Sequence, residues 1–193
     1  KKKLLSCDKG IYSLSNYLLS RGTNPVFENT AVTYLSSGEE KFEMLIKELE
    51  KAERFIFLEY FIITEGEMWR KVLEILERKV KDGVEVRVLY DGTCEFSKLP
   101  HSYPKTLRKK GIKCKMFAPI TPFISTHYNY RDHRKILVID GKVAYTGGVN
   151  LADEYINAVH PYGHWKDTGI RLEGEAVWEL TRLFLVDFGM NVW

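Results

Sequence analysis

Cysteine is scarce in this sequence of 193 residues, which contains only Cys7, Cys94 and Cys114. An odd number of cysteines with no CxxC pair and no metal-ligand spacing argues against a disulfide framework and against a zinc site. The three residues indicate free thiols in a protein from a reducing compartment.

Long apolar runs are also missing. No stretch reaches the ~20 residues that a membrane-spanning helix needs, and we identify no signal peptide. The longest apolar run, residues 55–63, is interrupted by Glu59 and is typical of a buried strand. The sequence begins with lysines rather than methionine and ends inside an apolar, helix-like stretch. We therefore expect a piece of a longer protein.

An excess of charge of one sign is the third feature that the sequence lacks. It has 29 Lys and Arg against 26 Asp and Glu, so the net charge is only +3. This balance argues against a nucleic-acid-binding protein that relies on bulk charge, although it leaves a local basic patch open. The hydrophobic content of 45% is that of an ordinary globular protein.

Helix and strand patterns alternate along the chain and predict one α/β domain. Asp140-Gly141 predicts a tight hairpin turn. The expected helices cover residues 11–19, 37–52, 67–81, 104–110 and 176–188, and the expected strands cover residues 54–63, 84–90, 112–117, 134–139, 143–146 and 165–172. Helical connections between strands favour parallel pairing, whereas the hairpin is antiparallel. We expect a mixed sheet with helices on both faces over residues 24–193, after an N-terminal extension or linker at residues 1–23.

The most specific chemical pattern is His133-x-Lys135 at the start of an expected strand, followed by a Gly-Gly-x-Asn sequence that ends at Asn150. Phosphodiester cleavage needs a nucleophile, neutralisation of the non-bridging oxygens and a proton for the leaving alkoxide. The imidazole of His133 can attack phosphorus and form a phosphohistidine without a metal. Lys135 points to the same strand face and, with the amide of Asn150, can hold the phosphate oxygens. Gly148 and its neighbour remove side-chain bulk where the backbone approaches the phosphate.

Three carboxylates are candidates for supporting residues. A nucleophilic histidine needs a carboxylate on its other ring nitrogen, and Asp167 is the first candidate. Glu59 is the second, because a charge in an apolar strand is costly unless it is paired. The alternatives are an ordinary surface aspartate for Asp167 and an ion pair with an arginine for Glu59. Asp140 has odd spacing from Lys135, so we expect it to point away from the site and hold the turn. The expected catalytic set is therefore His133, Lys135, Asp140 and Asp167.

These residues resemble the HKD signature of the phospholipase D superfamily, His-x-Lys-x-x-x-x-Asp followed by Gly-Gly-x-Asn. Residues 131–155 and 165–177 are similar to the first HKD half of bacterial cardiolipin synthases, as are residues 52–56 and 83–92. A Trp-basic-Asp-Thr segment occurs there at the place of Asp167. The likeness covers most of the chain from about residue 24 and implies a phospholipase D-like fold with one HKD half.

By that resemblance, the parent enzyme joins two phosphatidylglycerol molecules into cardiolipin through a phosphohistidine, without metal or organic cofactor. Such enzymes usually carry membrane helices before this region and a second HKD half after it. The resemblance thus implies a bacterial cell membrane location, a catalytic domain on the cytoplasmic side, and a second half from the same polypeptide or a homodimer partner. One imidazole cannot both attack in line and protonate the leaving group, so we expect little or no activity from this chain alone.

Two other functions stay open. The chain could be a single-HKD phosphodiesterase, such as an endonuclease, with its site built across a homodimer; the balanced charge disfavours this nucleic-acid substrate. It could instead be a non-catalytic half that binds lipid headgroups, against which the complete set of His133, Lys135 and Asn150 argues.

Overall fold

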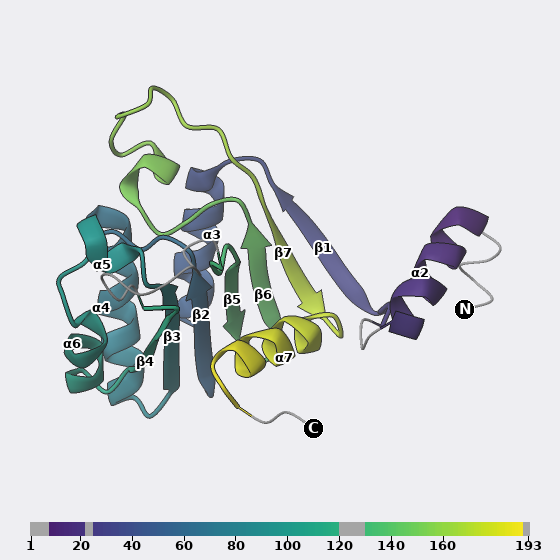
Figure 1. Ribbon diagram of the computed structural model, residues 1–193, viewed down its shortest axis with the longest axis horizontal. Helices are drawn as coiled ribbons and strands as arrows, with labels where there is room; N and C mark the ends of the chain where they lie inside the picture. The colour runs from purple at the N-terminus through teal and green to yellow at the C-terminus, as the bar shows by residue number, and fades with distance from the viewer. Residues whose placement is uncertain (1–7, 22–24, 120–129, 191–193) are drawn as a thin grey trace.

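The computed structural model describes residues 8–21, 25–119 and 130–190, and a mixed sheet of seven strands lies at the centre of this part of the chain (Figure 1). The strand order is β1-β7-β6-β5-β2-β3-β4. β2, β3 and β4 run parallel, and the remaining neighbours are antiparallel. The strands are β1 (Thr30–Leu35), β2 (Phe55–Tyr60), β3 (Glu85–Asp91), β4 (Lys113–Phe117), β5 (Lys135–Ile139), β6 (Val143–Gly147) and β7 (Gly169–Gly174).

Helices cover both faces of the sheet, which confirms the predicted fold class. The larger apolar core lies under α3 and α4, and a smaller one lies under α7 on the opposite face. The helices are α2 (Lys9–Arg21), α3 (Gly38–Leu49), α4 (Glu67–Lys81), α5 (Cys94–Ser97), α6 (Tyr103–Lys109) and α7 (Val177–Asp187), with a 3₁₀ helix η1 (Asp153–Ile156). Cys94 and Cys114 are buried free thiols, and Cys7 lies outside the described residues.

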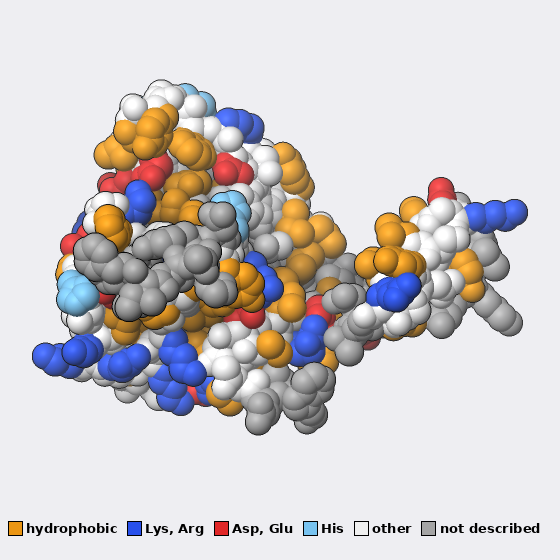
Figure 2. Space-filling model, in the orientation of Figure 1, with side chains coloured by type: hydrophobic (Ala, Val, Ile, Leu, Met, Phe, Trp, Pro, Cys, Tyr) orange, Lys and Arg blue, Asp and Glu red, His pale blue; other side chains and the backbone are white. Residues whose placement is uncertain are grey.

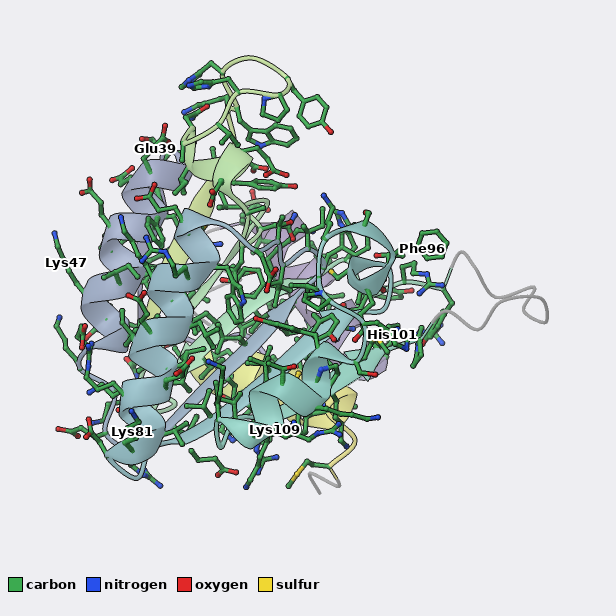
Figure 3. The ribbon with its side chains drawn as sticks, turned by 90° about the vertical axis from the view of Figure 1, so that its left-hand side faces the viewer. Glu39, Lys47, Lys81, Phe96, His101 and Lys109 are labelled. Carbon is green, nitrogen blue, oxygen red and sulfur yellow. The ribbon has the colours of Figure 1, made fainter. Side chains whose placement is uncertain are left out.

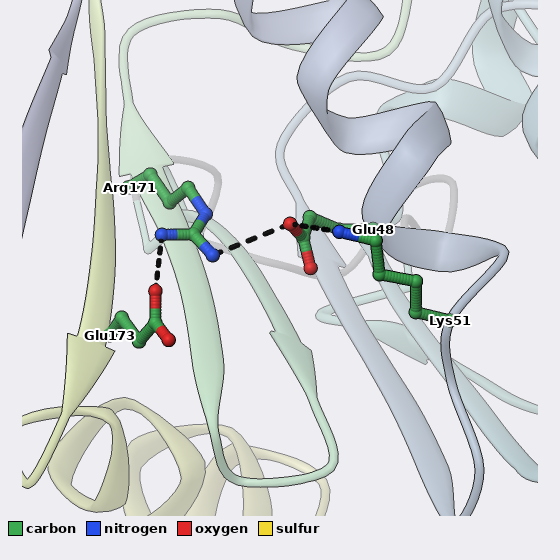
Figure 4. A network of polar contacts seen from close by, with 4 residues as sticks. All are labelled: Glu48, Lys51, Arg171 and Glu173. Atoms are coloured by element: carbon green, nitrogen blue, oxygen red, sulfur yellow. Dashed lines mark hydrogen bonds and ion pairs between the residues drawn. The ribbon is translucent and has the colours of Figure 1, made fainter.

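Helix α3 is held against the sheet at both ends. The Ser37 hydroxyl accepts a hydrogen bond from the backbone N–H of Glu40 (3.2 Å) and caps the first turn. In the last turn, Glu48 accepts from Arg171 of β7 (3.3 Å), which also pairs with Glu173 (2.8 Å; Figure 4). These contacts fix the helix relative to β7.

The β5–β6 hairpin turns at Asp140 and Gly141, whose φ values of 55° and 68° are those of a type I′ turn. The Asp140 carboxylate accepts hydrogen bonds from the backbone N–H groups of Glu53, Arg54 and Phe55 at 2.8–2.9 Å. Burial alone would raise the pKa of Asp140, but these three donors outweigh it and leave the pKa lowered. Asp140 thus anchors the start of β2, at the opposite end of β5 from Lys135 and roughly 17 Å away at ~3.4 Å per residue.

The sequence predicts helix α2 but not strand β1, nor the short α5 and η1. Strand β1 is not predicted because it lies at the sheet edge with four consecutive exposed residues, so it shows no alternation. Helix α2 has no buried residue and lies apart from the sheet (Figure 1). The expected boundary between extension and domain falls at residues 22–24, outside the described residues. Among the described helices, none combines the length and apolar character needed to cross a membrane.

Candidate active site

The ends of four strands bring the expected site residues to one side of the sheet, where β2 and β6 end and β5 and β7 begin; this side is called the site edge below. Lys135, the first residue of β5, pairs with Tyr60, the last residue of β2. The end of β6 pairs with the start of β7 on the site edge as well, since Gly147 lies opposite Gly169. Residues 148–150 leave the site edge and residues 165–168 approach it. The sheet topology therefore gathers segments that lie far apart in the sequence.

The side chains of His133 and Lys135 meet on the ring of Phe61. The imidazole of His133 is exposed, and its ring centroid lies 4.7 Å from that of Phe61. The Lys135 ammonium lies 5.3 Å from the same ring and donates a hydrogen bond to the backbone carbonyl of His133 (2.7 Å). Lys135 is only 3% exposed, and burial lowers its pKa, while the charges of Asp132 and Asp167 partly offset this effect. Sequence reasoning missed Phe61, although it directly follows the buried strand β2.

Asn150 lies beside this pair, and its carboxamide is largely engaged in the fold. Its Oδ1 accepts from the backbone N–H of Ile62 (3.0 Å), and its Nδ2 donates to the hydroxyl of Tyr155 (2.8 Å). These bonds tie the chain after β2 to η1. Asn150 is only 2% exposed, and its expected role as a donor to phosphate, through the second N–H of the carboxamide, stays a prediction.

The glycine pair lies close against the segment before β7. A Cβ on Gly148 would lie 2.0 Å from Oδ1 of Asp167, and one on Gly147 would lie 2.5 Å from the Thr168 carbonyl. The backbone N–H of Gly148 already donates to Thr168 (3.1 Å). The glycines therefore make room for the segment before β7, and the approach of a phosphate to Gly148 stays a prediction.

Asp167 lies on the side of Lys135 and, in the described part of the chain, is not hydrogen-bonded to the imidazole of His133. Its Oδ1 accepts from the backbone N–H of Thr168 (2.7 Å), and its charge raises the pKa of both Lys135 and Lys41. Within the described ranges, no hydrogen bond joins Asp167 to His133. The structure thus brings Asp167 into the site, on the side of Lys135.

Lys41 is a residue that sequence reasoning missed. It lies on α3 with no exposed surface, and its Nζ donates to the Val149 carbonyl (3.1 Å). Burial is the main cause that lowers its pKa to about 7; the charge of Asp167 acts in the opposite direction and that of Lys135 in the same one. A signal was present, since Lys41 precedes the core residue Leu45 by four positions and so shares its helix face.

Glu59 lies on the other face of the sheet and does not contact His133, which corrects its expected supporting role. It pairs with Ile136 across the β2–β5 ladder, next to the Tyr60–Lys135 pair, so its side chain points to the α7 side. Burial and the neighbouring Asp132 raise its pKa to about 8. Arg134 lies 3.5 Å from it and also pairs with Asp187 of α7. The arginine pair, the alternative considered for Glu59, is what the structure contains.

The sequence of this chain is similar to a known protein family and to several bacterial proteins. The family model described as "Cardiolipin synthase, PLD-like domain" matches residues 45–163. An uncharacterized protein of Streptococcus mutans is 60% identical over 183 residues, covering 95% of this chain and 40% of that protein. A cardiolipin synthase of Geobacillus kaustophilus is 41% identical over 168 residues (86% and 33%), and the major cardiolipin synthase of Bacillus subtilis is 38% identical over 175 residues (89% and 36%). The chain thus spans between about a third and two fifths of the length of these relatives.

Solved structures share the fold at low sequence identity. Phosphatidylserine synthase of Haemophilus influenzae superposes with a TM-score of 0.64 at 16% identity, covering 83% of this chain and 37% of that one. NucT from Helicobacter pylori gives a TM-score of 0.63 at 13% identity and is covered over 96% of its length. The same unit therefore occurs both as nearly a whole chain and as part of a longer one. Because the family model matches more than half of the chain, the chain belongs to the PLD-like domain family of cardiolipin synthases.

Proposed function

We propose that this chain is the first HKD half of a phosphatidyltransferase that makes cardiolipin from two phosphatidylglycerol molecules. The observation that carries the proposal is the exposed imidazole of His133 beside the Lys135 ammonium, both on the ring of Phe61. This pair occurs in a chain that is about 40% identical to proteins named cardiolipin synthase.

The reaction takes place in two displacements. His133 attacks the phosphorus of phosphatidylglycerol, the bond from phosphorus to the glycerol headgroup breaks, and a phosphatidyl-histidine forms. Lys135 and the second N–H of Asn150 stabilise the charge on the non-bridging oxygens. The hydroxyl of a second phosphatidylglycerol then attacks the phosphohistidine and gives its proton to the group that protonated the departing glycerol. The bond from phosphorus to the imidazole breaks, which gives cardiolipin and restores His133.

The leaving glycerol needs a proton from the side opposite His133, because attacking and leaving atoms lie in line through phosphorus. The described part of this chain places one histidine at the site. The second acid therefore comes from another HKD half, in the same polypeptide or in a homodimer partner. Because both substrates are lipids, the whole protein acts at the bacterial cell membrane, with this domain on the cytoplasmic side.

The alternative is a homodimeric single-HKD phosphodiesterase that acts on nucleic acid. An uneven charge distribution is the observation in its favour, since residues 96–131 contain no Asp or Glu. The Lys and Arg residues of this stretch are Lys98, Lys105, Arg108, Lys109, Lys110, Lys113, Lys115 and Arg131. Basic side chains gather at the lower left of Figure 2, where α4 and α6 end.

Most of these basic residues nevertheless lie far from the site, around the start of β4, and Arg131 is the member that is close to His133 in the sequence. Lys109 and Lys113 flank the start of β4, and the site lies where the parallel strands end. Lys110 and Lys113 are paired with Glu77 and Glu85. A phosphate backbone held there would not reach His133 within the same copy, which favours the lipid substrate.

The test uses the full-length protein that contains this chain and vesicles of phosphatidylglycerol. It measures the cardiolipin that forms and the glycerol that is released. His133→Gln should lower the rate on the order of 10³-fold or more, because it removes the nucleophile. His164→Gln is the matched control, since His164 is exposed in the loop before β7 and should leave the rate unchanged. Retained activity in His133→Gln would refute the phosphohistidine. A steep salt dependence of DNA binding would favour the nuclease.

A further inference from the structure

A completely buried lysine lies directly behind the site. Lys41 is on the inner face of α3 and outside the residues that the family model matches. Its aliphatic stem passes the start of β7, where a Cβ on Gly169 would lie 3.1 Å from Cδ of the lysine. Burying an amine is costly, and an apolar side chain of similar length would fill this space without that cost. The position therefore calls for an explanation in terms of charge.

We propose that Lys41 is a positioning residue of the phosphate site, whose ammonium holds the loop between β6 and Asn150 and competes with Lys135 for the carboxylate of Asp167. This inference rests on the proposed function, because it takes a phosphodiester as the ligand of Lys135.

The contacts of the loop support the first part. The Lys41 ammonium binds the carbonyl of Val149, a residue with no exposed surface. On one side of Val149 lies Gly148, packed on the Asp167 carboxylate, and on the other lies Asn150, bonded to the chain after β2. One hydrogen bond from α3 thus fixes the backbone from which two site residues project.

The charges support the second part. The charged groups of the described chain that act on the pKa of Lys41 are Asp167, before β7, and Lys135, on β5. From β2, the neutral ring of Tyr60 lies 5.6 Å from the amine. The charge of Asp132 also acts on Lys135. Whatever the net charge of these groups, protonation of Lys41 makes it one unit more positive, which favours binding of a phosphodiester monoanion.

The proposal has a direct consequence for pH dependence. Burial lowers the pKa of Lys41 to about 7, so its protonation changes across the physiological range. Below this value, the extra positive charge strengthens binding of a monoanion. Above it, this positive charge is lost and binding weakens.

The experiment measures the affinity of glycerophosphoglycerol, a soluble phosphodiester that stays a monoanion between pH 6 and 8. All variants are made in a His133→Gln background, so that the titration of this imidazole does not contribute. The parent should bind about tenfold more tightly at pH 6 than at pH 8, because one unit charge is added near the ligand. Lys41→Met should weaken binding at pH 6 about tenfold and remove most of the pH dependence; the remainder comes from Glu59, whose pKa is raised to about 8 beside Asp132.

The matched control is Lys47→Met, because Lys47 lies on the same helix and extends away from the sheet into solvent (Figure 3). It should leave both the affinity and the pH dependence unchanged. A Lys41→Met protein that binds more weakly but keeps the full pH dependence would show a purely structural role and overturn the proposal. Unchanged binding in Lys41→Met would overturn it as well.

A second measurement needs no ligand and keeps the inference separate from the proposed function. The titration of the Lys41 side chain is followed by NMR with ¹³C-labelled lysine and is assigned by its loss in Lys41→Met. Asp167→Asn should move this titration to lower pH, because the carboxylate stabilises the ammonium. An unmoved titration would refute the juxtaposition. A moved titration in a protein that does not bind the phosphodiester would instead reject the proposed function and leave the coupling of Lys41 to Asp167 intact.

Discussion

Replacing Asp140 with asparagine separates the structural role of the motif aspartate from any catalytic one. Asparagine has the same shape, but one carboxylate oxygen becomes an NH₂ group. Oδ1 of Asp140 accepts two backbone hydrogen bonds and Oδ2 accepts a third from Glu53. The substituted asparagine can keep the pair at Oδ1 as neutral bonds, whereas its NH₂ group would face the N–H of Glu53 without an acceptor.

The magnitude follows from these three bonds. A hydrogen bond to a charged group contributes roughly 1.5–3 kcal/mol, and a neutral one about 1 kcal/mol. Loss of one charged bond and weakening of two others therefore lowers the free energy of unfolding by about 2.5–7 kcal/mol. The turn itself should persist, because asparagine also adopts the positive φ of 55° seen at this position.

The assay is urea unfolding followed by circular dichroism at pH 7 and pH 3. The folded-state pKa of Asp140 is lowered, so its contribution is present above the unfolded pKa and is lost as the pH falls through the folded one. The difference between wild type and Asp140→Asn should therefore shrink at pH 3. Asp82→Asn, at an exposed aspartate after α4, is the control and should show neither effect. If Asp140→Asn unfolds like wild type at pH 7 but abolishes turnover, the structural assignment is wrong.

Three further predictions concern the site and the sheet behind it. Gly148→Ala should displace the Asp167 carboxylate, because the new Cβ would lie 2.0 Å from Oδ1. The overpacking should lower the free energy of unfolding by about 1–3 kcal/mol and thus lower the melting temperature. Gly10→Ala in the exposed helix α2 is the control. Glu59→Gln should remove a pH dependence of stability. The raised folded pKa of Glu59 makes its contribution fully present below the unfolded value and lost as the pH rises through about 8, so wild type should lose more stability than the variant between pH 5 and 8 in urea titrations. The isolated chain, shown to be monomeric by light scattering, should give little or no cardiolipin from phosphatidylglycerol; robust turnover by the monomer would refute the need for a second half.

Local patterns predicted much of the fold. The helix expected at residues 67–81 coincides with α4, and the Asp140-Gly141 turn forms as expected. Apolar periodicity and turn chemistry both depend on residues that are close together in the chain, so a single sequence is enough to predict them. Strand β1 was missed for the opposite reason, since its place depends on the backbone of β7, about 140 residues away.

The candidate site also has features that local spacing predicts and features that depend on distant segments of the chain. The pairing of His133 with Lys135 on one face follows from their spacing of two and could be predicted. The neighbours of Gly148 and the inward position of Lys41 depend on β7 and α3, and no local pattern contains those contacts. Spacing also could not tell which face of the sheet Glu59 takes, because that depends on the register between β2 and β5.

The alternation of a strand explains why adjacent residues of the motif do different work. Lys135 opens β5 on the α3 side, where it meets Phe61 and the charge of Asp167. Arg134 contacts Glu59 and Asp187, which binds the start of β5 to α7 on the other side. The charged network on the α7 side thus fixes the strand end from which His133 and Lys135 project, and Asp132 links it electrostatically to Lys135. A substitution at Arg134 should therefore act on the position of the strand, whereas one at Lys135 should act on the ligand.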